Sequence, residues 1–405
     1  MDTSFYKYGS QKIDADDCAA VLEALQRDEL TGGSLVEQFE EELGSYFKNK
    51  NVVVCNSGTS ALYIASKALS IGAGDVVIIP SQTFAATANA PHLLGAEVVF
   101  CDVDKNTGLI TAELLSEAIE VAETKFKNCR LKAVFVVHMN GQSAHMPSIA
   151  GVAKKWNMLV IEDACHAIGG SVSFDVNSSS KIGACAFSDA ATFSFHPVKN
   201  LTTCEGGAIS FADPESCRIG RNLRNHGIIR HDFGECAKPN VPFGSWTHKL
   251  EEPSLNFRIP DILCALGITQ LQKLDGWISK RAKLVDYYRK NLNCERLVKH
   301  INQCDWCLPA WHLMPVLINF GDGKRMEKKV RLFQLLNEKK IFPQVHYQPL
   351  HLQNYWKNRY NSVRLTGSET YFHRVMSLPL HVGLEETDLC FIVSNFKKCL
   401  MEVTQ

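Results

Sequence analysis

Between Asn51 and about Phe211, short runs rich in valine and isoleucine alternate with stretches of helical periodicity. The runs are Val52–Cys55, Val76–Ile79, Glu97–Cys101, Ala133–Val137, Met158–Ile161, Thr192–Phe195 and Ala208–Phe211. Strands that are apolar on both faces and joined by helices are typical of a mostly parallel sheet that helices cover on both sides. The sequence therefore predicts a doubly wound α/β domain, whose ligands bind at the carboxyl ends of its strands.

Two amphipathic helices are expected before this region. Asp14 is placed to cap the first, and its apolar face carries Cys18, Val21, Leu22 and Leu25. The second begins at Ser34, and Glu37 follows at the spacing of a capping box. Its apolar face carries Val36, Phe39, Leu43 and Phe47.

The chain after the predicted sheet divides into two parts. The stretch from Ile228 to about Asn256 is irregular and too long for an ordinary connection, so it is either functional or mobile. A helical pattern resumes at Asp261 and carries Leu263, Leu266, Leu271 and Leu274. A chain of 405 residues is long enough for about two domains, and we expect a second α/β domain here.

Composition excludes several classes of protein. Lys and Arg together number 43, as do Asp and Glu, so no net charge favours nucleic acid or an anionic membrane as a partner. No apolar run is long enough to span a bilayer, and the first residues contain no apolar signal segment, so we expect a cytoplasmic location. The 15 cysteines are scattered, and the pair Cys304 and Cys307 lacks a second pair of ligands, so we expect reduced thiols and no metal.

Lys199 gives the strongest chemical signal in the sequence. It follows the run that ends at Phe195, Ser194 precedes it by five residues, and Gly206-Gly207 lies shortly after it. Most lysines are solvated, but a buried lysine loses its proton more readily and becomes a nucleophile toward an aldehyde. The glycine pair would let the backbone pass close to a ligand.

Asp163 ends another apolar run, with His166 three residues later. At a turn from strand to helix, such an aspartate is either a helix cap or an anion that holds a cationic ring nitrogen. Pyridoxal phosphate needs an anion of this kind, because its protonated pyridine is the better electron sink. His166 either covers that ring, orients Asp163, or is a structural histidine.

Gly58 and Thr59 follow a third run and open a helix that carries Ala61, Ile64, Ala65 and Ala68. They form either a plain cap or a phosphate site, because free N–H groups and the helix dipole both favour an anion. Phe84 follows a fourth run and is either a core residue or a ring that stacks on a planar cofactor. All four features are expected at one edge of the sheet.

These residues resemble the DegT/DnrJ/EryC1/StrS family of sugar aminotransferases over nearly the whole chain. The similar segments are Asn56–Leu62, Pro80–Ala90, Gly141-Gln142, Ile161–Gly169, Phe193–Gly207, Leu223–Gly227, Asp261–Leu274 and Val345–Leu352. The resemblance implies a fold-type-I transferase that binds pyridoxal 5'-phosphate. We expect an N-terminal helix and substrate-lining loop in residues 1–33, a cofactor-binding large domain in 34–255 and a small domain in 256–405.

The resemblance also assigns roles to single residues. Lys199 matches the lysine that binds the cofactor covalently, Asp163 matches the partner of the ring nitrogen, and His166 lies at the position beside the ring. The matching phosphate ligands are Gly58, Thr59 and Ser194, and the matching stacking residue is Phe84. Asn256 falls in the segment that reaches the phosphate of the neighbouring subunit, which implies a homodimer with shared sites.

The expected reaction moves an amino group from glutamate to C4 of a nucleotide-linked 4-keto-6-deoxy hexose, with UDP as the expected nucleotide. The run from Thr202 to Gly207 resembles that of C4-acting members, although Cys204 replaces their glycine. Residues 232–255 depart from the family in composition, and 254–260 replace its usual pattern. The expected substrate contacts are Tyr6, Gly32, Gly33 and His346, with Lys7 and Arg258 as further candidates for its phosphates.

Other activities on the same fold remain alternatives. A sugar dehydratase of this family commonly has histidine at the position of Lys199, so the lysine argues against that activity. Amination at C3 is a further alternative, because the loop after Lys199 helps to set which carbon of the sugar ring reaches the lysine. A non-catalytic regulator is disfavoured by the presence of Lys199, Asp163 and Ser194 together.

Overall fold

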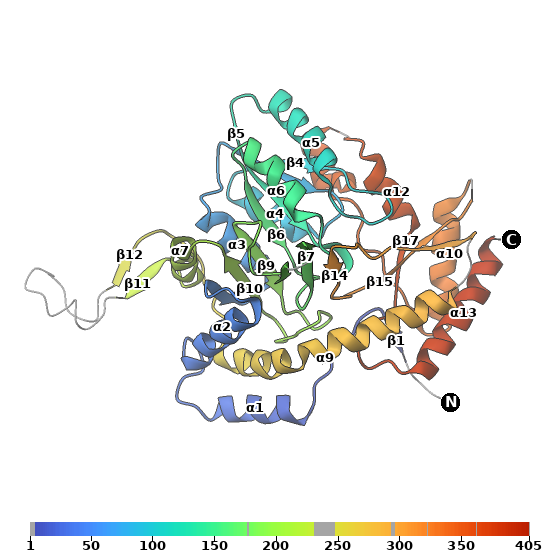
Figure 1. Ribbon diagram of the computed structural model, residues 1–405, viewed down its shortest axis with the longest axis horizontal. Helices are drawn as coiled ribbons and strands as arrows, with labels where there is room; N and C mark the ends of the chain where they lie inside the picture. The colour runs from blue at the N-terminus through green and yellow to red at the C-terminus, as the bar shows by residue number, and fades with distance from the viewer. Residues whose placement is uncertain are drawn as a thin grey trace, which may run out of the picture.

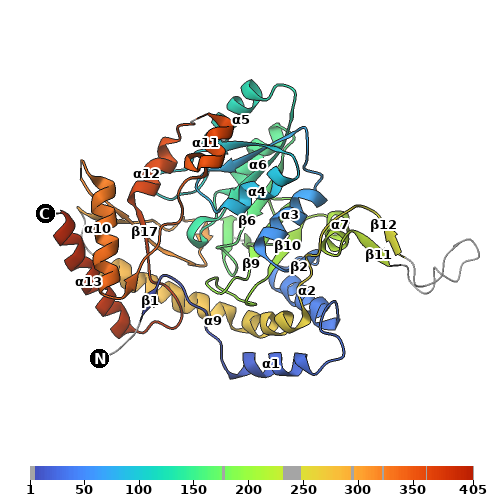
Figure 2. The ribbon, with the colours of Figure 1, turned by 180° about the vertical axis from the view of Figure 1, so that it is seen from behind.

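A computed structural model of the chain describes residues 5–175, 178–230, 248–292, 296–321, 323–361 and 363–404. Figures 1 and 2 show a large lobe built around a central sheet and a smaller lobe that contains α10 (Arg325–Glu338) and α13 (Glu386–Thr404). The long helix α9 (Asp261–Asn291) runs along both lobes. Most of the irregular stretch predicted after Ile228 lies outside the described residues.

The central sheet has seven strands in the order β2-β10-β9-β6-β5-β3-β4. In chain order they are β2 (Val52–Cys55), β3 (Asp75–Pro80), β4 (Glu97–Cys101), β5 (Arg130–Val137), β6 (Leu159–Asp163), β9 (Ala190–Ser194) and β10 (Gly207–Phe211). β10 runs antiparallel to the other six strands, which all point the same way. The predicted fold class is confirmed, and each predicted run forms one strand of this sheet.

Helices cover both faces of the sheet because successive side chains of a strand point to opposite faces. In β3, Val76 and Ile78 pack beneath α5 (Ala112–Lys125) and α6 (Met146–Lys155), whereas Val77 and Ile79 pack with α4 (Ala85–Leu93). The remaining helices of these layers are α2 (Ser34–Phe47), α3 (Gly58–Ala68) and α7 (Pro214–Arg224). The strands β2, β3, β6 and β9 point the same way, so their carboxyl ends share one edge.

The small lobe has its own antiparallel sheet and core. The sheet has the order β13-β15-β17, with β13 (Val298–His300), β15 (Met314–Ile318) and β17 (Val375–Leu378). The second half of α9 packs into this core, and its first half packs into the core of the large lobe. The helix therefore joins the two cores. The predicted division of the chain into residues 1–33, 34–255 and 256–405 stays a prediction.

Shorter elements complete the fold. They are β1 (Tyr6–Lys7) with β16 (Ile341–Phe342), β7 (Ser171–Asp175) with β8 (Ser178–Lys181) and β14 (Cys307–Leu308), β11 (Ile228–Arg230) with β12 (His248–Leu250), η1 (Met139–Gly141), η2 (Leu350–Leu352), α1 (Ala15–Leu25), α11 (Asn354–Tyr360) and α12 (Thr366–Arg374).

The predicted inward face of α1 is wrong. Asp14 caps the helix as expected, but Cys18, Leu22 and Leu25 are exposed. The helix lies against α9 (Figure 1) and buries Asp17, whose carboxylate lies 2.9 Å from Nζ of Lys273. A charged contact with the neighbouring helix therefore decides the inward face.

The predicted capping box of α2 is also wrong, although the helix begins at Ser34 and buries its predicted apolar face. Gly33 is the N-cap residue and provides no side-chain hydrogen bond. The buried carboxylate of Asp261 instead accepts hydrogen bonds from the backbone N–H groups of Gly33 at 3.0 Å and Leu35 at 3.2 Å.

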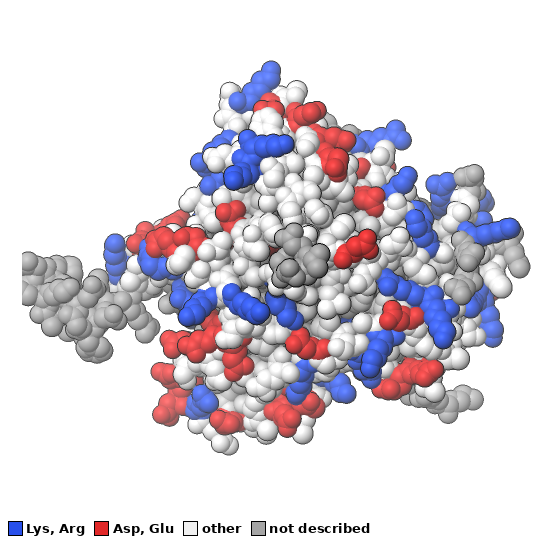
Figure 3. Space-filling view, viewed as in Figure 1, with Lys and Arg blue, Asp and Glu red and all other residues white. Residues whose placement is uncertain are grey.

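The surface of the described residues carries both basic and acidic side chains, as the balanced charge of the whole sequence predicts. On the face shown in Figure 3, basic and acidic side chains are interspersed. No helix in the described ranges is both long and apolar enough to cross a membrane. Among the same residues, no group of three or more His, Cys, Asp or Glu side chains is arranged to hold a metal, and Cys304 and Cys307 are free thiols.

Candidate active site

A cavity of about 530 Å³ lies at the carboxyl edge of the central sheet. Eight of the predicted site residues line it: Gly58, Thr59, Phe84, Asp163, His166, Ser194, Lys199 and His346. They come from segments far apart in the sequence, and four of those segments follow parallel strands of one sheet. The expected meeting of a helix N-terminus, an aromatic ring, an acid and a lysine is confirmed.

Lys199 lies in the wall of this cavity, and its Nζ has no hydrogen-bond partner among the described residues. Burial lowers the pKa of the amine, while the nearby Cys165 and Asp163 raise it. Because burial is the larger cause, the neutral amine is more populated than in a solvated lysine. The neutral amine is the form that can bond to an aldehyde.

Asp163 is buried and held from two sides. Its Oδ2 accepts a hydrogen bond from Oγ1 of Thr87 at 2.6 Å, and its Oδ1 accepts one from the backbone N–H of Cys165 at 3.2 Å. The hydroxyls of Thr83 and Thr87 lie 2.8 Å apart. An ionised carboxylate only accepts, so Thr87 donates to Asp163 and accepts from Thr83. The two hydroxyls therefore orient the carboxylate.

The turn before α3 is shaped for a small anion. Ser57 is the N-cap residue, and its Oγ accepts from the backbone N–H of Ser60 at 3.1 Å. Gly58 opens the helix so close to Ser194 that an added Cβ would lie 2.7 Å from the Cβ of that serine. A helix N-terminus and a hydroxyl thus converge at one end of the cavity, which suits a phosphate group.

Gly207, at the start of the neighbouring strand β10, packs against the same turn. A Cβ at this position would lie 2.4 Å from the backbone oxygen of Ser57. Gly207 therefore permits a close approach between two segments of the chain, and the predicted approach of the glycine pair to a ligand stays a prediction. Cys204, in the loop before this pair, is exposed and has a positive φ of 65°, a conformation that suits the glycine it replaces.

Three buried histidines surround the lysine. Nε2 of His166 lies 3.0 Å from the hydroxyl of Tyr347, and the His166 and His312 rings are 4.6 Å apart. Nδ1 of His346 lies 2.9 Å from Oγ of Ser377. Burial and the nearby Lys199 lower the pKa of all three, to about 3 for His346. The cavity therefore has neutral imidazoles at neutral pH.

Some predicted residues lie outside this cavity. Tyr6 donates its hydroxyl to Asp388 in the small lobe, and Tyr8 is the N-terminal residue that lines the cavity. Gly32 is exposed in the loop before α2, and Asn256 is exposed beside Asn56. The other candidates outside the cavity are Gly33, Lys7 and Arg258.

Thr87 and His312 are among the residues of the site that were missed in the sequence. Thr87 follows Thr83 by one helical turn within Pro80–Ala90, so its spacing could have suggested a second hydroxyl on the same side of the helix. His312 has no such signal, because it is a single histidine just before β15. Its place in the cavity depends on the small lobe.

The site residues fit pyridoxal phosphate in chemical type. They supply an amine of lowered pKa, a carboxylate supported by a hydroxyl, and a helix N-terminus beside a serine hydroxyl. Nδ1 of His166 and Nδ1 of His312 are buried and have no partner within the described residues. The cavity therefore has polar groups available for a ligand.

Comparisons with known proteins agree with this chemistry. The model of the DegT/DnrJ/EryC1/StrS aminotransferase family matches residues 11–397. A Campylobacter jejuni protein named UDP-4-amino-4,6-dideoxy-N-acetyl-beta-L-altrosamine transaminase is 35% identical over 98% of each chain. The Helicobacter pylori PseC structure, an aminotransferase of pseudoaminic acid biosynthesis, has a TM-score of 0.87 and 28% identity, and covers 98% of this chain and 100% of its own.

A third similar structure contains a bound cofactor. The structure of NtdA from Bacillus subtilis, with bound cofactor PMP, has a TM-score of 0.79 and 25% identity, covering 96% of this chain and 83% of its own. The cavity residues and these similarities lead to one assignment. The chain belongs to the DegT/DnrJ/EryC1/StrS aminotransferase family and is an aminotransferase that uses pyridoxal phosphate.

Proposed function

We propose that this aminotransferase moves an amino group from glutamate to C4 of a nucleotide-linked 4-keto-6-deoxy hexose, which is UDP-linked and N-acetylated. The observation that carries the proposal is the 35% identity, over 98% of both chains, with a transaminase named for such a sugar. Glu205, from the loop that resembles C4-acting members, lines the cavity with Lys199 and so supports a contact between this loop and the sugar.

Most of these cavity residues would bind the cofactor, and Lys199 would transfer protons. Pyridoxal phosphate, when bound, supplies an electron sink and carries the amino group between the two substrates. Asp163 would hold the ring nitrogen protonated, while Gly58, Thr59 and Ser194 would hold the phosphate. Phe84 would cover one face of the ring. Lys199 would carry a proton on Nζ between the substrate carbon that holds the amino group and the cofactor carbon, first as a general base and then as a general acid.

A panel of substrates tests the reaction. The enzyme is incubated with glutamate and UDP-, dTDP- and GDP-linked 3-keto and 4-keto sugars, and the new amine is located by NMR. We expect amination at C4 of the UDP-linked sugar. Amination at C3, or preference for a dTDP or GDP sugar, would contradict the corresponding part of the proposal.

Covalent labelling tests the role of Lys199. Borohydride reduction of the holoenzyme followed by peptide mapping should place the cofactor on this residue, because its amine has a lowered pKa and faces the cavity. The Lys199→Ala variant should carry no label and show no turnover. A label on another lysine would contradict the assignment.

We further propose a homodimer in which Asn256 of each subunit completes the site of the other. Asn256 is exposed in one chain, and its backbone oxygen accepts a hydrogen bond from Asn56 at 3.4 Å, beside the phosphate turn. A neighbouring subunit could therefore bring its cofactor phosphate to this position.

Mixed dimers test the sharing of sites. Lys199→Ala and Asn256→Ala variants, each inactive alone, are unfolded together and refolded. A mixed dimer would contain one site with both residues intact, so activity should reappear. Verified mixed dimers without activity would contradict shared sites.

A further inference from the structure

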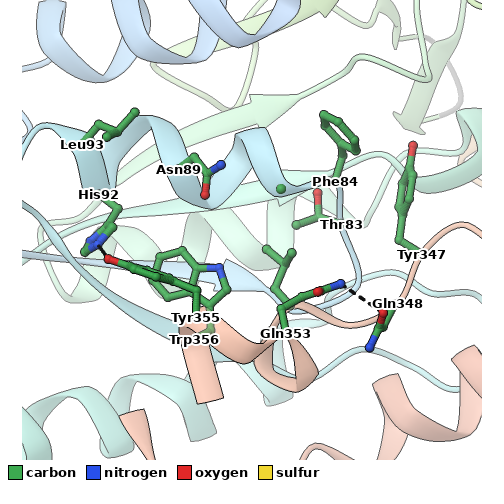
Figure 4. A pocket seen from close by; sticks show the side chains of 12 residues that line it. Thr83, Phe84, Asn89, His92, Leu93, Tyr347, Gln348, Gln353, Tyr355 and Trp356 are labelled. Carbon is green, nitrogen blue, oxygen red and sulfur yellow. Dashed lines mark hydrogen bonds between the residues drawn. The ribbon is translucent and has the colours of Figure 1, made fainter. Parts of the chain in front are cut away.

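A second cavity of about 660 Å³ adjoins the catalytic one. Figure 4 shows the side chains that line it, and Thr83, Phe84 and Tyr347 line both cavities. A ligand that reaches Lys199 can therefore extend past Phe84 and Tyr347 into this second space.

The walls of the second cavity are aromatic and uncharged. None of the described residues that line it is Asp, Glu, Lys or Arg. Trp356 is buried and packs edge-on against Phe100, with ring centroids 5.3 Å apart. The Tyr355 hydroxyl lies 2.5 Å from Nε2 of His92, whose Nδ1 lies 3.2 Å from the Ala96 oxygen. Fixed aromatic rings without charge suit a flat, neutral ring.

Three carboxamide side chains in the wall of this cavity can form hydrogen bonds with a ligand. Nε2 of Gln353 donates to Oε1 of Gln348 at 3.2 Å, so the Gln353 oxygen and the Gln348 amide N–H groups stay available. Asn89, on α4, lies on the other side of the cavity (Figure 4) and makes no side-chain hydrogen bond within the described part of the chain. A carboxamide presents a donor beside an acceptor, which matches the N–H and C=O groups of a pyrimidine imide.

We propose that this second cavity binds the uracil base of the nucleotide-sugar substrate, with Asn89 and Gln353 hydrogen-bonded to its imide edge. The inference rests on the proposed function for the identity of the substrate. A diphosphate separates base from sugar in such a substrate, so the base needs a pocket beyond that of the sugar. The second cavity shares lining residues with the first, and its described lining has no Asp, Glu, Lys or Arg, which suits a neutral base.

Binding of UMP to the holoenzyme tests the proposal without requiring turnover. We measure its dissociation constant by calorimetry for wild-type enzyme and for Asn89→Leu and Gln353→Leu. Loss of one hydrogen bond should weaken UMP binding about tenfold in each variant. The variants should also raise KM for the UDP sugar while kcat stays within twofold. Asn395→Leu replaces a half-buried helical asparagine in the small lobe and is the control.

The outcomes separate this proposal from the proposed function. UMP binding that both variants leave unchanged would overturn the base pocket, whether or not the enzyme aminates a UDP sugar. If the variants instead shift the enzyme from dimer to monomer with UMP binding unchanged, a second copy of the chain covers the cavity and the proposal also fails. Wild-type enzyme that binds UMP here but does not aminate a UDP-linked 4-keto sugar would overturn the proposed reaction alone.

Discussion

Oγ1 of Thr87 lies 2.6 Å from Oδ2 of Asp163 and donates a hydrogen bond to it. The two residues are 76 positions apart and meet because α4 begins at the same edge of the sheet where β6 ends. A hydrogen bond to the charged form of a carboxylate stabilises that form. Thr87 is therefore a positioning residue for the predicted partner of the ring nitrogen.

Replacement of this hydroxyl should impair the cofactor site without unfolding the protein. In Thr87→Val we expect pyridoxal phosphate affinity and kcat to fall by about tenfold to a hundredfold, because hydrogen bonds to charged groups contribute about 1.5–3 kcal/mol. Visible absorption titrations measure the affinity, and steady-state kinetics measure kcat and KM. Thr87→Ser should restore most of both.

Thr192→Val is the matched control for the loss of a buried hydroxyl. Thr192 is also fully buried, but its hydroxyl donates to the backbone oxygen of Glu162 at 3.2 Å and makes no hydrogen bond to the Asp163 carboxylate among the described residues. Equal losses of cofactor affinity in the Thr192 and Thr87 variants would show that the effect is one of packing.

A methyl group at Gly58 should close the phosphate end of the cavity. The added Cβ of Gly58→Ala would lie 2.7 Å from the Cβ of Ser194, closer than side chains tolerate. We expect cofactor affinity to fall at least tenfold as the two segments separate, with circular dichroism unchanged. Gly151→Ala is the control, because a Cβ there meets no atom within 4 Å. Normal cofactor binding by Gly58→Ala would exclude a phosphate site at this turn.

Acid should destabilise the protein through its buried histidines. Burial, followed by the nearby Lys199, lowers the pKa of His346 to about 3. Below about pH 6.5 an unfolded histidine binds a proton that the folded one does not, so the free energy of unfolding falls as pH falls. The loss is about 1.4 kcal/mol per pH unit for each such proton.

Urea unfolding at pH 7.5, 6.5, 5.5 and 5.0 measures this effect. The His346→Asn variant should show a shallower dependence on pH than wild-type enzyme in the same cofactor state, by about one proton at pH 5.5. Parallel curves for the two proteins would mean that His346 is protonated in the folded state.

Asp261 should stabilise the start of α2. Its buried carboxylate accepts two backbone N–H groups that the helix leaves without partners. In Asp261→Ala we expect the free energy of unfolding to fall by at least 1–2 kcal/mol, the usual cost of losing an N-cap, with more from the buried site. Asp213→Ala, which removes the exposed cap of α7, should cost less. Equal losses would show that burial adds nothing.

Much of the site could be predicted because its residues follow strands. Lys199, Asp163 and Gly58 each stand shortly after an apolar run, and the parallel sheet brings the ends of these runs to one cavity. Tyr8 was harder to find, because it reaches the cavity through the pairing of β1 with β16 in the small lobe. That pairing joins residues far apart in the chain and leaves no local pattern.

The sequence by itself determined the seven strands of the central sheet and the apolar face of α2, because a run of apolar residues and a helical period are local properties. Only the tertiary structure decided the inward face of α1, where Asp17 meets Lys273 of α9. It also decided the cap of α2, since Asp261 lies 228 positions from Gly33. A polar group is satisfied by whichever partner the fold brings near, and sequence spacing specifies that partner only within one helix or turn.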